Sequence, residues 1–176
     1  MRDKVTAEKL NHFMQELAHR SRGPGCVYLA GGSSALLLGI REQTVDVDLK
    51  LDPEPAGAFE AISSLKNELN LNVELASPDD FIPAPPNWRS LGKLIATIGT
   101  VTYYHYDFNM QALAKIERGF SQDLDDVQAF MAKGLITQNS IQERFDQIKG
   151  MIVRYPALDA ESFSNKIARF FKPEVC

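Results

Sequence analysis

The sequence predicts an α/β protein: a small mixed sheet flanked by helices, followed by a C-terminal helical region. Two observations support this fold class. Up to Asp107, short apolar runs typical of strands alternate with segments of helical periodicity. After Asp107, every periodic segment is helical and ends near a glycine or proline. We therefore expect a core over residues 1–108 and a helical region over residues 109–176.

The first half opens with a helix, a strand and a second helix. Residues 6–20 carry apolar side chains at helical spacing behind Thr6, which predicts a capped helix. The run CVYLA (26–30) is typical of a short buried strand. The short apolar segment SSALLLG, ending at Gly39, predicts the next helix. A third helix is expected over about residues 56–69.

Further strands are expected on both sides of a proline-rich loop. The segment TVDVDLKLD alternates strictly, so that its apolar and polar residues face opposite ways. The apolar set is Val45, Val47, Leu49 and Leu51, and the polar set is Asp46, Asp48, Lys50 and Asp52. A third strand is expected within 69–77, and KLIATIG with TVTYYHYD is typical of a hairpin turned at Gly99.

The composition restricts the class of protein. Of 176 residues, 44% are hydrophobic and 24% charged, as in ordinary globular proteins. We expect no membrane span, no signal peptide and no disulfide framework from Cys26 and Cys176, and thus a cytoplasmic protein. The net charge of -4 argues against a dedicated duplex-binding protein, but it permits local contact with RNA.

The glycine turn between the first strand and the second helix is a candidate anion site. Amides at the start of a helix favour an anion, and glycine lets a phosphate approach the backbone closely. Gly31, Gly32, Ser33 and Ser34 are the candidate residues. A tight turn with a serine cap is the alternative reading, because short glycine motifs occur often by chance.

Asp46 and Asp48 are candidate metal ligands. Two residues apart on a strand, they lie on one face with Cα atoms about 6.5–7 Å apart. Two carboxylates about 5 Å apart repel by about 3 kcal/mol at an effective dielectric of 20. A cation such as Mg²⁺ (or Mn²⁺) turns this repulsion into binding. The alternative is a solvated strand face, although aspartate is depleted from strands.

The order strand, Gly-Gly-Ser, short helix and Asp-x-Asp resembles the nucleotidyltransferase superfamily, the fold of polymerase-β-like and minimal nucleotidyltransferases. The resemblance implies that the turn holds a nucleoside triphosphate (NTP) and that the two aspartates hold Mg²⁺. It also implies a third acid on the following strand, here Glu74, with Asp79 or Asp80 as alternatives. Neither a P-loop motif nor a G-x-G-x-x-G dinucleotide motif is present.

The segment KIERGFSQDLDD resembles the toxin-type branch related to abortive-infection (type IV toxin–antitoxin) nucleotidyltransferases. This resemblance implies catalytic roles for Lys115 and Asp123 and a nucleotide-binding role for Arg118, with Asp126 also matching. Arg41 and Thr44 match residues that precede Asp-x-Asp in that branch, and Lys50 is a further nucleotide-binding candidate. A helix-surface position is the alternative for Lys115. For two of Asp123, Asp125 and Asp126, the alternative is that they lie in a first helical turn, where the helix dipole favours acidic residues.

Together these features predict an enzyme that moves NMP from an NTP to an acceptor. The metal ligands are expected to be Asp46, Asp48 and Glu74. RNA such as tRNA is the favoured acceptor and protein the alternative, and the toxin resemblance implies a cognate antitoxin as a partner. The basic path expected for RNA consists of Arg41, Lys50, Arg89, Lys93, Lys115 and Arg118. The alternatives are a non-catalytic nucleotide-binding regulator or antitoxin on the same fold, and a small dinucleotide-binding module.

Overall fold

A computed structural model describes residues 1–172, so Cys176 lies outside the described part. The chain divides into two units, which are described separately. The sheet unit comprises Met1–Ser77 and Gly92–Tyr106, and the helical unit comprises Pro78–Leu91 and the chain from Asp107 onward. The proline-rich segment 78–91 therefore belongs to the helical unit, although the expected boundary at residue 108 had grouped it with the core.

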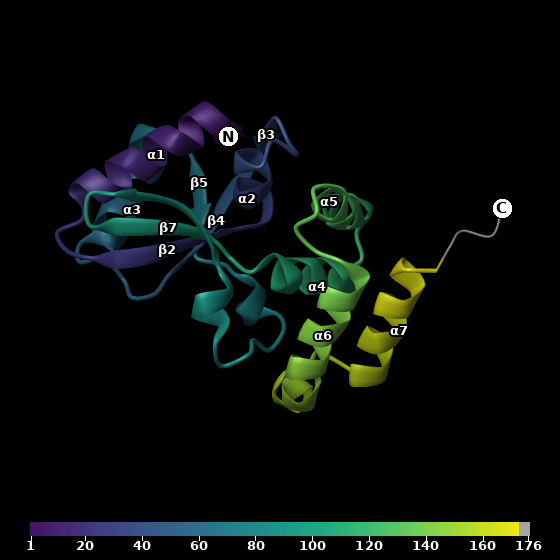
Figure 1. The fold of residues 1–176 in the computed structure, drawn as a ribbon. Coiled ribbons are helices and arrows are strands. Elements are labelled where there is room, and N and C mark those ends of the chain that lie inside the picture. The colour runs from purple at the N-terminus through teal and green to yellow at the C-terminus, as the bar shows by residue number, and fades with distance from the viewer. Residues whose placement is uncertain (173–176) are drawn as a thin grey trace. The chain divides into compact units, whose positions relative to one another are not determined.

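The sheet unit contains a five-stranded mixed sheet in the order β5-β4-β2-β7-β6 and a two-stranded sheet β1-β3 (Figure 1). Its elements in chain order are β1 (Val5–Thr6), α1 (Ala7–Arg20), β2 (Gly25–Ala30), α2 (Gly31–Leu37), β3 (Gln43–Thr44), β4 (Asp46–Leu51), α3 (Ala58–Glu68), β5 (Asn72–Glu74), β6 (Lys93–Ile98) and β7 (Val101–His105). The strand β2 is antiparallel to β4 and parallel to β7. The mixed sheet flanked by helices that the sequence predicted is confirmed.

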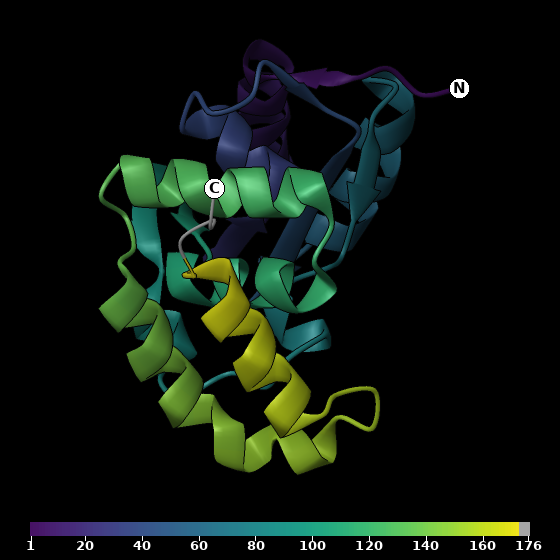
Figure 2. The ribbon, with the colours of Figure 1, turned by 90° about the vertical axis from the view of Figure 1, so that its right-hand side faces the viewer.

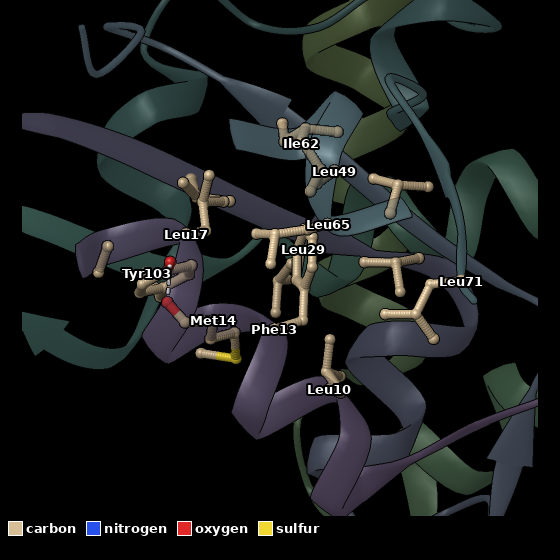
Figure 3. Close-up of a cluster of buried hydrophobic side chains, with 14 of the residues drawn as sticks. Leu10, Phe13, Met14, Leu17, Leu29, Leu49, Ile62, Leu65, Leu71 and Tyr103 are labelled. Carbon is tan, nitrogen blue, oxygen red and sulfur yellow. Dashed lines mark hydrogen bonds between the residues drawn. The ribbon is translucent and has the colours of Figure 1, made fainter. Parts of the chain in front are cut away.

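Helices α1 and α3 supply the core of the sheet unit (Figure 3). The Thr6 side chain caps α1 by accepting a hydrogen bond from the amide of Lys9, as the sequence predicted. The buried side chains of α1 and α3 pack with Leu29 and Leu49 from the sheet. The hydroxyl of Tyr103 donates to the carbonyl of Met14 at 2.6 Å, and burial raises the pKa of this phenol. The one polar atom of the Tyr103 side chain in this core is therefore hydrogen-bonded.

The alternating segment differs from its prediction at Val45, which is 63% exposed. Val47 and Leu49 are fully buried, as expected from the alternation. The reason is a change of partner: β3 pairs with β1, whereas β4 pairs with β2 and β5. Val45 lies between the two strands, so the expected single strand is two short ones.

Within its described residues, the helical unit contains four α-helices and three 3-10 helices, and Figures 1 and 2 show their arrangement along the chain. They are η1 (Pro78–Asp80), η2 (Trp88–Leu91), α4 (Phe108–Arg118), α5 (Ser121–Ala132), α6 (Gln138–Ile148), η3 (Lys149–Arg154) and α7 (Ala160–Phe170). Helix α4 contacts α5, α6 and α7. Asp107 caps α4 by accepting from the amide of Met110 and also pairs with Arg144 at 2.8 Å. In the described part of the chain, no helix is both long and apolar enough to cross a membrane.

Candidate functional site

The glycine turn and the Asp-x-Asp strand meet at Gly31 and Asp48. Residue Ala30, which ends β2, pairs with Asp48 of β4, so the turn begins beside this aspartate. Gly31 has a φ of +56°, which favours glycine, and a Cβ at this position would lie only 2.5 Å from Oδ2 of Asp48. The same carboxylate that is expected to hold a metal therefore lies against the first residue of the turn.

The neighbouring Gly32 is required for a different reason. A Cβ there would lie 2.0 Å from Oγ1 and 2.7 Å from Cβ of Thr44, which is itself buried. Thr44 belongs to β3, and therefore the turn is packed against both β3 and β4. Any side chain at residue 32 would push α2 away from these strands.

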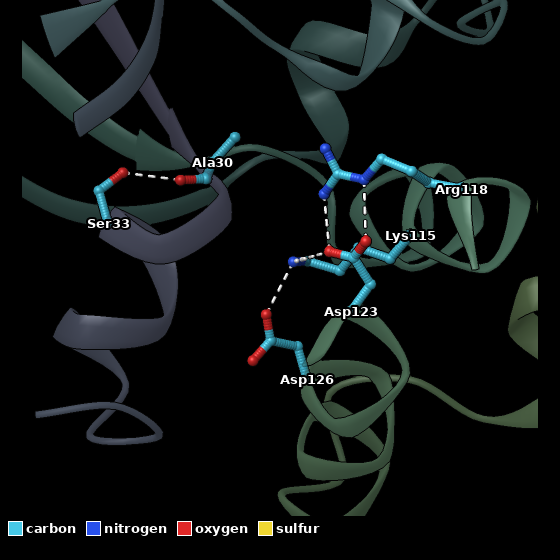
Figure 4. Close-up of polar contacts among 6 residues, drawn as sticks. All are labelled: Ala30, Ser33, Lys115, Arg118, Asp123 and Asp126. Carbon is cyan, nitrogen blue, oxygen red and sulfur yellow. Dashed lines mark hydrogen bonds and ion pairs between the residues drawn. The ribbon is translucent and has the colours of Figure 1, made fainter. Parts of the chain in front are cut away.

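Both serines of the turn are fully buried, and their hydroxyls form hydrogen bonds within the protein. The Ser33 hydroxyl donates to the carbonyl of Ala30 at 2.7 Å (Figure 4) and lies 3.1 Å from the carbonyl of Asp48. Helix α2 begins at Gly31, and no side chain caps it. The reading of Ser33 or Ser34 as a helix cap is therefore wrong, because both lie within the first helical turn. Their hydroxyls hold the turn in place.

Asp46, Asp48 and Glu74 lie on one face of two adjacent parallel strands. The register pairs Asp46 with Asn72 and Asp48 with Glu74, and neighbouring strands are about 4.8 Å apart. Both aspartates are half-buried, whereas Glu74 is exposed. In the described part of the chain, no three His, Cys, Asp or Glu side chains are grouped so as to hold a metal ion. Glu74 as a third ligand stays a prediction.

Asn72 is a residue of this face that the sequence interpretation missed. Its amide nitrogen donates to Oδ1 of Asp46 at 2.5 Å and to Oε1 of Glu74 at 3.2 Å. It therefore joins two of the predicted acids and fixes the orientation of the Asp46 carboxylate. Strand alternation was the available signal, since Asn72 precedes Glu74 by two residues on the same face.

His105 is the second residue that the sequence interpretation missed. Its Nδ1 lies 2.6 Å from the hydroxyl of Ser34, and both side chains are buried. Burial, and to a lesser extent the nearby charge of Lys93, lowers the pKa of His105 to about 4. The ring is therefore neutral near pH 7. No local sequence pattern indicated this pairing.

The four charged candidates of the helical unit form one cluster (Figure 4). The Lys115 ammonium lies 2.7 Å from Oδ2 of Asp126 and 3.5 Å from Oδ1 of Asp123. Arg118 holds Asp123 with two hydrogen bonds, of 2.8 and 2.6 Å. Lys115 is only 5% exposed, so the reading of it as a surface lysine is wrong. Asp123 and Asp126 are also buried, and they neutralise the two cations of the cluster.

The remaining cations of the expected basic path lie at different places. Lys50 shares the face of Asp48, two residues along β4, whereas Lys93 lies on β6, with β2 and β7 between it and β4. At about 4.8 Å per strand, β6 is roughly 14 Å from β4. Arg41 precedes β3. In the helical unit, the guanidinium carbon of Arg89 lies 4.7 Å from the ring centroid of Trp88, a cation–π contact.

A mixed sheet flanked by helices, with a glycine turn against an Asp-x-Asp strand, defines the fold as nucleotidyltransferase-like. A family model described as "Nucleotidyltransferase of unknown function (DUF6036)" matches residues 7–172, and the chain belongs to this family. The match covers both units and supports membership of the nucleotidyltransferase superfamily. A search of curated proteins and a search of solved structures found no match.

Proposed function

We propose that the protein is a metal-dependent nucleotidyltransferase that transfers NMP from an NTP to an acceptor hydroxyl. The observation that carries this proposal is the approach of Asp48 to the glycine turn, where a Cβ on Gly31 would lie 2.5 Å from Oδ2. A bound triphosphate at the turn would then lie next to the carboxylates of β4. Family membership supports the same chemistry.

The donor chemistry of this face suits Mg²⁺ or Mn²⁺. Asp46 and Asp48 offer hard carboxylate oxygens, and Mg²⁺ is commonly held by one or two carboxylates together with substrate phosphates and water. When bound, the ion would neutralise phosphate charge at the reacting centre. Asn72 orients the Asp46 carboxylate for this role, since its amide occupies one side of that group.

The reaction is a displacement at the α-phosphorus of the NTP. The acceptor oxygen forms a bond to this phosphorus, the bond to the β-phosphate bridge breaks, and pyrophosphate leaves. Glu74, exposed beside Asp48, is the proposed base that takes the hydroxyl proton. The Gly31–Gly32 turn holds the triphosphate in line, so that catalysis depends mainly on positioning.

The first test is metal-dependent NTP binding, measured by thermal unfolding. At an NTP concentration 100 times Kd, binding adds about 2.7 kcal/mol, which for a chain of this length raises Tm by roughly 5–10 °C. We expect this shift in Mg²⁺ but not in chelator, and not in Asp46→Asn or Asp48→Asn. Asp52→Asn is the matched control, because it removes a carboxylate that directly follows the end of β4, and it should keep the thermal shift. Equal shifts in all variants would refute the metal site.

The second test identifies the acceptor. The toxin-type resemblance favours RNA such as tRNA, with protein as the alternative and a cognate antitoxin as partner of the same system. Lys50 lies on the proposed face, whereas Lys93 is three strands away from β4, so the basic path is only partly supported. Each labelled NTP is incubated with Mg²⁺ and total RNA or protein. Label in RNA supports the toxin-type reading, and label in neither excludes transfer to these acceptors.

Lys115 and Asp123 as catalytic residues, and Arg118 as a nucleotide contact, stay predictions. For Lys115, the variants Lys115→Arg and Lys115→Met are compared in the same transfer assay, because arginine keeps the positive charge of this buried position. If catalysis needs this cation, methionine abolishes transfer at a temperature at which circular dichroism shows the variant to be folded, and arginine retains part of it. Equal activity in the two variants would assign Lys115 to folding alone.

A non-catalytic nucleotide-binding regulator or antitoxin is the second candidate. The buried hydroxyls of Ser33 and Ser34 bond within the protein, so they add nothing that favours the enzyme over such a regulator. A regulator would show the metal-dependent thermal shift without release of pyrophosphate. The two assays above therefore distinguish it from the enzyme.

A further inference from the structure

The buried pair Ser34–His105 connects the first turn of α2 to the strand β7. Ser34 is 0% and His105 is 6% exposed, and 2.6 Å separates the hydroxyl from Nδ1. The two residues are 71 positions apart in the chain. A buried hydrogen bond of this kind holds two elements in one arrangement, because breaking it leaves polar groups away from water.

The pair lies beside the proposed triphosphate turn. His105 pairs with Leu29 in the parallel register of β2 and β7, and the amide of Tyr106 donates to the Leu29 carbonyl at 2.8 Å. Leu29 precedes Gly31 by only two residues. The first turn of α2 is thus held from one side by the Ser33 hydroxyl and from the other by His105.

The tolerance for movement at this turn is small. Gly31 lies against the carboxylate of Asp48, and Gly32 lies against Thr44. At either position an added Cβ would clash with the neighbouring side chain. A shift of α2 towards β4 would therefore meet Asp48, and a shift away would widen the space between the turn and this aspartate. The neutral state of His105 keeps the bond to Ser34 unchanged across the physiological pH range.

We propose that Ser34 and His105 are positioning residues that set the distance between the Gly31–Gly32 turn and Asp48, and thereby the affinity for the metal–NTP complex. This inference rests on the proposed function. Neither side chain touches the substrate. Both act through the placement of α2, and losing either one has the same consequence for binding.

The test compares Ser34→Ala, His105→Phe, the double variant and His105→Asn. The probe is whichever of ATP, GTP, CTP or UTP gives the largest thermal shift with Mg²⁺, and its Kd is measured by calorimetry well below each variant's Tm. Ser34→Ala and His105→Phe should each raise Kd about tenfold, and the double variant should be no weaker than either. His105→Asn, whose side-chain amide reaches the position of Nδ1, should recover most of the affinity.

The matched control is Tyr103→Phe, which removes another buried hydrogen bond on β7 without a link to α2. It should lower Tm but leave Kd unchanged. If Tyr103→Phe raises Kd as much as His105→Phe, or if Ser34→Ala binds like wild type, the positioning role is overturned. If the wild type binds no NTP in Mg²⁺, the proposed function itself fails, so the two failures are distinguishable.

Discussion

Replacing Lys115 with methionine should strongly destabilise the protein, because it removes the one buried cation from a cluster of four charges in which Arg118 is exposed and the two carboxylates are buried. Lys115, Asp123 and Asp126 are 5%, 6% and 3% exposed, and the Lys115 ammonium lies 2.7 Å from Asp126. Without Lys115 the cluster carries one excess negative charge. Removing one partner of a buried ion pair typically costs about 3–5 kcal/mol.

For a chain of this length, that loss corresponds to a fall in Tm of roughly 6–20 °C. Urea unfolding at pH 7 measures it as a lower midpoint at an unchanged slope. Lys133→Met, at an exposed lysine of the same unit, is the control and should change the free energy of unfolding by less than about 0.5 kcal/mol. Lys115→Met combined with Asp126→Asn should recover much of the loss, because the remaining charges balance.

Two results would contradict this expectation: a loss of stability in Lys115→Met no larger than in Lys133→Met, or a combined variant no more stable than Lys115→Met alone. Either result would mean that the buried carboxylates do not depend on the ammonium for their charge balance.

Three further predictions concern the sheet unit. Gly32→Ala should destabilise the fold by about 1–3 kcal/mol in urea unfolding, because its Cβ would meet Thr44, and adding Thr44→Gly should relieve part of this loss. The free energy of unfolding should fall by about 3 kcal/mol between pH 6.5 and pH 4, because His105 takes up a proton near pH 6.5 in the unfolded state but only near its pKa of about 4 in the folded state. The variant His105→Asn should lack this pH dependence. Val45→Ala should be nearly neutral, whereas Val47→Ala should cost about 2 kcal/mol, since only Val47 is buried; equal losses would contradict the split between β3 and β4.

The elements that the sequence predicted well have signals within a few residues. Thr6 caps α1, and the hairpin between β6 and β7 turns at Gly99. The apolar alternation of Val47 and Leu49 also located one face of β4. In these cases the backbone conformation depends on neighbouring side chains, so a local pattern is sufficient.

The contacts that organise the candidate site join residues that are far apart in the sequence. Asn72 meets Asp46 across 26 positions, and His105 meets Ser34 across 71. No local pattern specifies such partners, because the pairing depends on which strands become neighbours. Lys115 was ambiguous for a related reason: lysine is usually exposed, and only the packing of α4 against α5 brings two carboxylates to it.

The interrupted course of the helical unit affects how the chain folds during synthesis. Residues 78–91 leave the ribosome before the hairpin of β6 and β7, yet one of their contacts is the hydroxyl of Tyr155, which donates to the carbonyl of Asp79. Tyr155 follows Leu91 by 64 residues (155 − 91), which at 5–20 residues per second is a delay of roughly 3–13 s. The sheet unit is complete at Tyr106, so it has time to form first. During that interval the hydrogen bond from Tyr155 to this segment cannot form, so the helical unit is completed only after the sheet unit.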